Sequence, residues 1–143
     1  MPIFLSQVPG SDTNMFSFPL DHVGVAVTSL QEACALFQSL AGTPCSSPEI
    51  LEAQGVRVAF AGSVELIEPL GPDTSVARFL DRRGPGLHHI AYRVPNLPDV
   101  LSRLSEEGFR LIDAEPRDGA RGHQVAFLHP KSTGGILIEL VSD

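Results

Sequence analysis

The chain has 143 residues, enough for one compact unit with a sizeable hydrophobic core. Its composition, 43% hydrophobic and 19% charged, is ordinary for a globular protein, and no apolar run is long enough to cross a membrane. The net charge of −7 argues against a nucleic acid partner. Two cysteines are too few for a disulfide scaffold, so we expect a reducing, cytoplasmic setting.

Residues 1–19 are expected to form an N-terminal leader outside the folded domain. This stretch contains no basic residue, and polar residues and prolines interrupt its apolar positions. It therefore fits neither a secretory signal nor an arginine-rich transit peptide.

The first half of the chain predicts a strand, a helix and then further strands. Alternating apolar residues indicate a strand over Leu20–Val27, and Ser29 then caps a helix that ends at Gly42. The apolar positions that predict the buried face of this helix are Leu30, Ala33, Cys34, Phe37 and Leu40. Further strands are expected at 50–53, 56–60 and 64–70, with a short helix at 75–83.

The second half repeats this order. Leu87–Val94 predicts a strand, and Asn96 caps a helix that ends at Gly108. Strands are then expected at 109–112, 125–128 and 135–141, with a Gly/Pro-rich loop at 114–122. We therefore predict one α+β domain over 20–143, in which two tandem βαβββ modules form a curved mixed sheet around a cleft. Module 1 covers about 20–72, a connecting helix about 73–84, and module 2 about 85–143.

Each half carries one histidine and one glutamate at matching places. His22 and His89 lie in the first strands, LDHVGVAV and LHHIAYRV, while Glu65 and Glu139 lie in the later strand segments VEL and IEL. Taken singly, each histidine is explained as a hydrogen-bonded core residue and each glutamate as a solvated one. Duplication favours a shared site, because an inward carboxylate in an apolar strand is costly unless it is paired or metal-bound.

Two neighbouring residues are expected to face away from that site. His88 points opposite to His89, toward a helix layer, because strand faces alternate. Glu68 is three residues beyond Glu65 and is predicted to lie on the surface. Two histidines and two carboxylates suit Co, Mn, Ni, Fe or Zn, and a six-coordinate ion would keep positions open for chemistry.

These residues resemble the vicinal oxygen chelate superfamily and, within it, the methylmalonyl-CoA epimerase family. The resemblance runs from Leu20 to Leu140, and its most discriminating part is the segment His129-Pro130-Lys131-Ser132. The matching segments are residues 20–27, 54–56, 64–70, 75–80, 86–91 and 127–140.

The resemblance implies a homodimer that takes an acyl-CoA and interconverts (2R)- and (2S)-methylmalonyl-CoA through an enolate. It implies a divalent metal, Co(II) first, with Zn, Mn, Ni or Mg as alternatives. The ligands carried over to this chain are His22, Glu65, His89 and Glu139. Glu139 would also act as one of two acid/base groups on opposite faces of the substrate carbon.

The second acid/base group is not fixed by the resemblance. Some members carry a glutamate on the strand after Gln-Gly-Val, where this chain has Val58. Glu49, Glu52 or a metal-bound water could take that role, and the choice stays open.

The CoA phosphates need positive charge that the acidic chain must supply locally. Lys131, Arg117 and Arg121 are the candidates, because they flank the last strands, and Lys131 belongs to the discriminating segment. For each of them the simpler interpretation is a solvated surface charge.

Three alternatives remain. One is another metalloenzyme of the superfamily. It could be a glyoxalase I, which acts on a glutathione hemithioacetal. It could also be an extradiol dioxygenase, although that enzyme needs an open coordination position on its iron, which Glu65 would occupy in this chain. Another is a metal-free small-molecule binding protein, against which the four ligands argue. The last is a structural or regulatory dimer that has kept a vestigial site, which Val58 would favour.

Overall fold

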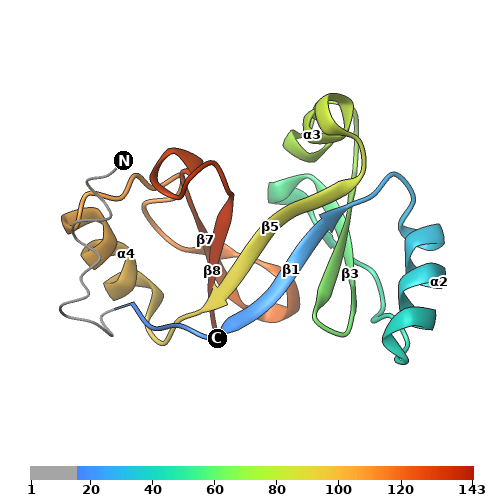
Figure 1. The fold of residues 1–143 in the computed structure, drawn as a ribbon, viewed down its shortest axis with the longest axis horizontal. Helices are drawn as coiled ribbons and strands as arrows, with labels where there is room; N and C mark the ends of the chain where they lie inside the picture. Colours follow the sequence, from blue (N-terminus) through green and yellow to red (C-terminus); the bar gives the residue numbers. More distant parts are fainter. Residues whose placement is uncertain (1–15) are drawn as a thin grey trace. The chain divides into compact units, whose positions relative to one another are not determined.

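A computed structural model describes residues 16–143, which form two compact units (Figure 1). One unit spans residues 22–89, and the other spans residues 90–143 together with 16–21. Most of the predicted leader, residues 1–15, lies outside the described residues.

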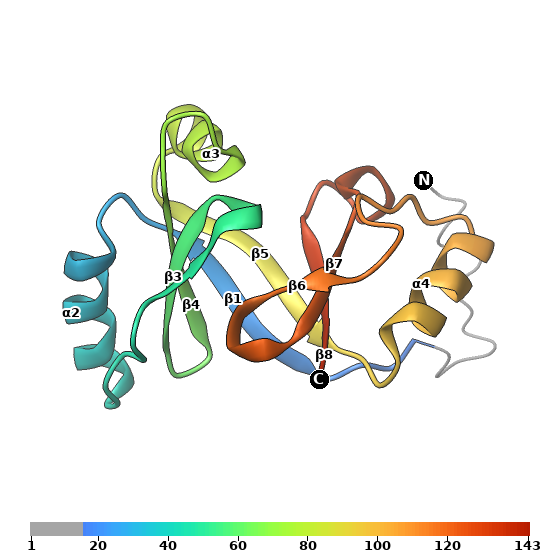
Figure 2. The ribbon, with the colours of Figure 1, turned by 180° about the vertical axis from the view of Figure 1, so that it is seen from behind.

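The 22–89 unit contains a four-stranded mixed sheet. Its elements are β1 (Leu20–Ala26), α2 (Leu30–Ala41), β2 (Glu49–Leu51), a 3-10 turn (Glu52–Gln54), β3 (Val56–Ala61), β4 (Val64–Pro69) and α3 (Ser75–Arg83). The strand order is β2-β3-β4-β1, with β1 parallel to β4 and the other pairs antiparallel. Helix α2 packs beside β3 and β4, as Figures 1 and 2 show.

The 90–143 unit repeats this arrangement. Strand β5 (Gly86–Arg93) leads into it, followed by α4 (Leu97–Glu106), β6 (Arg117–Asp118), β7 (Gln124–Leu128) and β8 (Ile138–Ser142). Two 3-10 turns, Ala120–Gly122 and Pro130–Ser132, lie between its last strands. The order is β5-β8-β7-β6, and the parallel pair is again the first and last strand of the module. The predicted α+β fold of two βαβββ modules is thus confirmed.

The predicted helix caps are also confirmed. Ser29 accepts a hydrogen bond from the Glu32 amide at the start of α2, and Asn96 accepts one from the Asp99 amide at the start of α4. Gly42 ends α2 in the left-handed conformation that glycine adopts at little steric cost. These local interactions set where the two long helices begin and where α2 ends.

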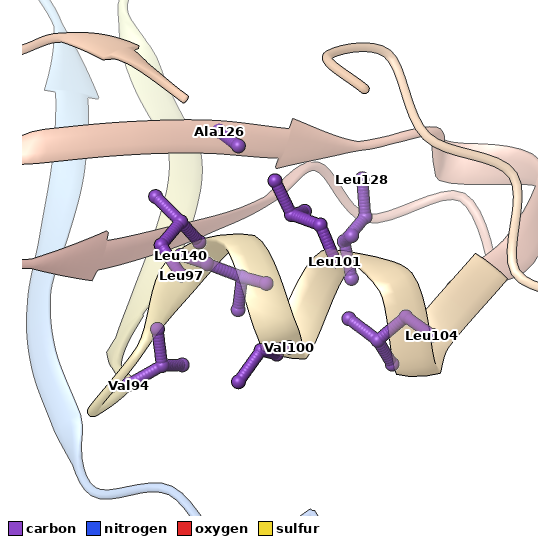
Figure 3. Close-up of a cluster of buried hydrophobic side chains, with 8 residues drawn as sticks. All are labelled: Val94, Leu97, Val100, Leu101, Leu104, Ala126, Leu128 and Leu140. Carbon is purple, nitrogen blue, oxygen red and sulfur yellow. The ribbon is translucent and has the colours of Figure 1, made fainter. Parts of the chain in front are cut away.

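The core of the 90–143 unit lies between α4 and its sheet (Figure 3). Leu97, Val100, Leu101 and Leu104 recur at helical spacing and form the buried face of α4. The strand and loop residues packed against this face are Val94, Ala126, Leu128 and Leu140.

Helix α2 is less buried than its sequence pattern predicts. Leu30 is its one buried residue, while Ala33, Cys34 and Phe37 are half-buried against the sheet. The prediction for Leu40 is wrong, since its side chain is 75% exposed near the end of the helix.

Cys34, predicted on the buried face of this helix, is half-buried and forms no disulfide. Burial and a hydrogen bond with the Cys45 thiol raise the pKa of Cys34 to about 12. The Cys34 thiol is therefore protonated at neutral pH.

Two further predictions need correction. Residues 109–112 do not form a strand: only Leu111 bridges to Leu128, because the Asp113 carboxylate accepts the Phe127 amide proton and ends the pairing. Glu68 is not a free surface residue either. It pairs with Arg57 at 2.7 Å and accepts the amide proton of Leu30, the first residue of α2. A carboxylate at a helix N-terminus is favoured by the helix dipole.

The predicted loop at 114–122 is largely irregular but contains β6, two residues paired antiparallel with β7. Among residues 16–143, no helix has the length and apolar character that a membrane span requires.

Because α4 is buried more deeply than α2, a leucine-to-alanine change should destabilise the protein more in α4 than in α2. Leu101→Ala should lower the free energy of unfolding by about 2–5 kcal/mol, because Leu101 is 2% exposed and its removal leaves a cavity. Leu40→Ala, a matched change on an exposed helix face, should stay within about 0.5 kcal/mol. Urea unfolding measures both, and equal effects would contradict this description of the core.

Candidate metal centre

Three polar side chains are buried together in the 22–89 unit. His22 lies on β1 and shares a buried face with Gly24 and Ala26. In the parallel register, Gly24 pairs with Glu65 of β4, which brings the Glu65 side chain beside the His22 face. His89 lies on β5. His22 and His89 are 4% exposed and Glu65 is 6% exposed.

The three side chains converge on one point. The Oε1 atom of Glu65 lies 3.2 Å from Nε2 of His22 and 3.3 Å from Nε2 of His89. The two Nε2 atoms are 3.3 Å apart. Nitrogen and oxygen donors therefore form a nearly equilateral triangle inside the protein.

The histidines determine the charge state of Glu65. Burial alone would raise the pKa of this carboxyl, but hydrogen bonds from His22 and His89 outweigh burial and lower the pKa to about 2. Glu65 is therefore a carboxylate at neutral pH, and the two imidazoles offset the cost of burying its charge.

The neighbours of the triangle fix the two rings. Phe60 contacts the His22 ring edge-on, with centroids 5.5 Å apart. Gly24 lies directly against the His89 ring, since a Cβ atom at this position would stand 2.2–2.7 Å from three of the ring atoms. Only glycine leaves this space open, so the lack of a side chain at position 24 allows the His89 ring to lie against β1.

The donor triangle fits a divalent metal ion. Bonds of about 2.0–2.2 Å separate neighbouring ligand atoms in a coordination shell by about 2.8–3.6 Å, which includes the distances observed between these donors. Two imidazole nitrogens and a carboxylate oxygen suit Co, Mn, Ni, Fe or Zn rather than a soft ion. His22, Glu65 and His89 thus belong to a group whose ligand atoms lie within 4.8 Å of one another and could hold a metal.

Glu139, the fourth predicted ligand, lies on β8 in the 90–143 unit. It is 6% exposed and pairs in register with Ala91 of β5 and Phe127 of β7. Its place on the last strand of its module matches the place of Glu65 on β4.

The two candidates for the second acid/base group differ in position. Glu49 is half-buried on β2 and pairs in register with Val58, which pairs in turn with Ile67 of β4. Ile67 is two residues from Glu65, so Glu49 and Glu65 lie on the same face of this sheet. Glu52 lies in the 3-10 turn after β2 and is exposed.

The predicted arginines are engaged in ion pairs within the 90–143 unit. Arg117 lies 3.5 Å from the Asp113 carboxylate and stacks over the Phe127 ring. Arg121 lies 3.6 Å from the buried carboxylate of Asp21.

Lys131 lies exposed in the turn Pro130–Ser132. The His129 side chain accepts the amide proton of Lys131 at 3.1 Å and so caps this turn. The Ser132 hydroxyl accepts the amide proton of Arg110. The His-Pro-Lys-Ser segment is therefore a folded turn that presents the lysine side chain.

His88 contacts a residue of the donor triangle, although the sequence pattern predicts that it faces away from the site. His88 faces Phe79 of α3, as predicted for the helix layer, with ring centroids 5.0 Å apart. Its Nδ1 atom nevertheless lies 2.9 Å from Nδ1 of His89. The His-His doublet was the available signal, but strand alternation alone assigns the two rings to opposite faces.

Residues 21–127 match the family model of the Glyoxalase/Bleomycin resistance protein/Dioxygenase superfamily. The chain belongs to this superfamily. The resemblance to the vicinal oxygen chelate superfamily, and the fold of two βαβββ modules, are both confirmed by this match and by the relatives below.

Three relatives illustrate the similarity. The chain is 46% identical to the uncharacterized protein YqjC of Bacillus subtilis, over 85% of this chain and 89% of that protein. It is 38% identical to the mitochondrial methylmalonyl-CoA epimerase of Homo sapiens, over 95% and 79%. The crystal structure of methylmalonyl-CoA epimerase from Mycobacterium tuberculosis superimposes with a TM-score of 0.81 at 38% identity, covering 87% of each chain.

The space beside His89 gives a direct test of the donor triangle. Gly24→Ala should displace the His89 ring and weaken Co(II) binding at least about 10-fold, because the new methyl group overlaps that ring. Gly71→Ala is the matched control, since a Cβ there meets nothing within 4 Å. Isothermal titration calorimetry measures the affinity and circular dichroism checks the fold. A well-folded Gly24→Ala protein with unchanged Co(II) affinity would contradict the proposed role of His89.

Proposed function

We propose that this protein is a metal-dependent epimerase that interconverts (2R)- and (2S)-methylmalonyl-CoA. The observation that carries the proposal is the buried triangle of His22, Glu65 and His89 in a chain 38% identical to a methylmalonyl-CoA epimerase. An enzyme of this kind removes the proton from the carbon between thioester and carboxylate and returns a proton to the opposite face.

Glu139 is proposed as the fourth ligand. Two observations support this proposal. Glu139 holds the same place in the second module that Glu65 holds in the first, and the pairing of β8 with β5 sets the direction of its side chain. Glu139 pairs with Ala91, and Ala91 is two residues from His89 along β5, so strand alternation directs the three side chains to one face. An exposure of only 6% for each of the two glutamates fits a role as metal ligands better than one as solvated side chains.

The cation proposed for these donors is Co(II), with Zn, Mn, Ni or Mg as alternatives. When bound, such an ion supplies Lewis acidity that polarises the thioester carbonyl and favours the enolate. The protein's own contribution is a rigid, dry donor set that needs little reorganisation when substrate arrives.

The proton transfers are assigned to two glutamates. Glu139 would serve one face of the substrate carbon. For the other face we propose Glu49, because it shares the sheet face of Glu65 and is half-buried, whereas Glu52 is exposed in a turn. The register partner of Glu49 is Val58, the position where some epimerases carry a glutamate, so Glu49 can reach the same region from the neighbouring strand.

Lys131 is proposed as the main contact for the CoA phosphates. It is exposed at the end of a capped turn, while Arg117 and Arg121 already lie beside carboxylates. The two arginines would contribute only after exchanging these partners, so their part in phosphate binding would be smaller.

Isotope exchange tests this function. The purified protein is loaded with Co(II) and incubated separately with (2R)- and (2S)-methylmalonyl-CoA in D2O, and deuterium at C2 is followed by mass spectrometry. Rapid exchange that stops after treatment with a chelator is the expected result. It should also stop with both enantiomers in Glu139→Gln, because this change removes a base and alters a proposed metal ligand at once. No exchange by folded, metal-loaded protein would overturn the proposal and direct attention to glutathione hemithioacetals, substrates of glyoxalases in the same superfamily.

The second base gives a sharper prediction. Glu49→Gln should slow epimerisation by about 10²–10⁴-fold, because one proton transfer loses its acid/base group. Deuterium exchange should persist with one enantiomer only, since Glu139 still serves one face. Glu52→Gln is the matched control and should behave as the unchanged protein. Normal epimerisation by Glu49→Gln would exclude Glu49 as the second base.

A further inference from the structure

We infer that Cys34 and Cys45 form a reversible disulfide by exchange with a small disulfide molecule. The inference is independent of the proposed function, because neither cysteine belongs to the donor triangle. It is carried by the approach of the two residues. Sγ of Cys45 lies 3.9 Å from the backbone carbonyl oxygen of Cys34, and the two thiols share a hydrogen bond. The chain has two cysteines in all, so no third thiol competes.

Both cysteines are held in place by their surroundings. Cys34 lies in α2, and Cys45 lies in the loop between α2 and β2. The Cys45 amide donates a hydrogen bond of 3.1 Å to the side-chain oxygen of Gln38 in α2. The next residue, Ser46, is joined to Phe60 of β3 by two hydrogen bonds of 2.8 Å. Because both α2 and β3 hold this loop, we expect the two sulfur atoms to reach bonding distance through side-chain rotation.

A surface pocket gives a small oxidant access to this pair. The pocket has a volume of about 530 Å³, and both cysteines line it together with Gln31, Gln38, Arg57 and Glu68. The glutamine amides can donate to and accept from peptide groups. The Arg57 side chain is 41% exposed beside Glu68 and can donate further hydrogen bonds to a carboxylate. The pocket therefore suits a small polar disulfide, for which oxidised glutathione is the probe.

The two thiols react in a fixed order. Burial, followed by the hydrogen bond with Cys45 and the charge of that residue, raises the pKa of Cys34 to about 12. Cys34 is therefore protonated at neutral pH. The thiolate is the form that attacks a disulfide, so we assign the first attack to Cys45. Its sulfur bonds to one sulfur atom of the small disulfide, and the other sulfur atom leaves as a thiolate.

The second step closes the protein disulfide. Once Cys45 is part of a mixed disulfide, it has no charge that opposes ionisation of Cys34. The Cys34 sulfur attacks Sγ of Cys45, and the Cys34 proton passes to the small thiolate that leaves. In total the two protein thiols lose two electrons and two protons, and the small disulfide gains both to become two small thiols. An excess of small thiol reverses the two steps.

Mass spectrometry tests the disulfide. The purified protein is incubated with excess oxidised glutathione, remaining thiols are blocked with iodoacetamide, and the intact protein and its peptides are weighed. We expect a product without blocked cysteines or bound glutathione, in which the Cys34 and Cys45 peptides of one chain are cross-linked. Dithiothreitol should restore both thiols. A mixed disulfide that persists, a cross-link between two chains, or two unreacted thiols would overturn the inference.

Serine variants separate the two roles. Cys34→Ser should stop at the mixed disulfide, with one glutathione on Cys45, because the second thiol is missing. Cys45→Ser should add glutathione at least about 10-fold more slowly, because burial, the largest cause of the raised pKa of Cys34, remains. Circular dichroism checks that both variants fold. Equal rates of glutathione addition to the two variants would contradict the assigned order.

Urea unfolding tests whether the folded chain accommodates the bond. A cross-link between α2 and the following loop restricts the unfolded chain, so the oxidised protein should unfold at a urea concentration roughly 1 M higher than the reduced protein. Cys34→Ser treated with the same oxidant is the control and should show no such gain. An oxidised protein that unfolds at the same or a lower urea concentration would contradict the inference that this geometry suits a disulfide.

Discussion

The buried carboxylate of Glu65 between two imidazoles is the interaction on which the rest of the site depends. A charge at this depth is stable only with close partners, and the Nε2 atoms of His22 and His89 provide them at 3.2 and 3.3 Å. Once the Nε2 atoms give up their protons, the same three atoms offer lone pairs at separations that suit a coordination shell. The three side chains of this cluster therefore offset the cost of one another's burial and lie at separations that suit a metal ion.

The strands supply the precision of this arrangement. Parallel pairing of β1 with β4 sets Gly24 opposite Glu65, and the missing side chain of Gly24 is the space that the His89 ring occupies. Side chains on paired strands move little, so the donors need no large rearrangement to bind. The helix contributes as well, since Glu68 on the same strand binds the first amide of α2 and Arg57 of β3. One strand thus directs Glu65 to the donor triangle and Glu68 to the helix.

Sequence reasoning recovered much of this because the chain repeats itself. Duplication of a histidine and a glutamate in apolar strands identified His22, Glu65 and His89, and alternation identified the strands that carry them. It failed where a single local contact decides the outcome. The Asp113 carboxylate replaces a predicted strand pairing near residues 109–112, and Glu68 has partners that lie far away in the sequence. The contact between His88 and His89 depends on side-chain rotamers, which no periodicity encodes. Glu49 and Glu52 are close in the sequence, and the strand register, which sequence spacing does not reveal, distinguishes their positions relative to Glu65.

The most direct measurement is X-ray absorption at the cobalt edge of the protein loaded with one equivalent of Co(II). Two buried histidines and carboxylate oxygens should give a first shell of nitrogen and oxygen only, with the outer-shell scattering pattern of two imidazole rings. A sulfur shell would place the ion at Cys34 and Cys45, and a shell of oxygen alone would mean surface carboxylates. Either result would contradict the central claim that the triangle of His22, Glu65 and His89 is the metal centre.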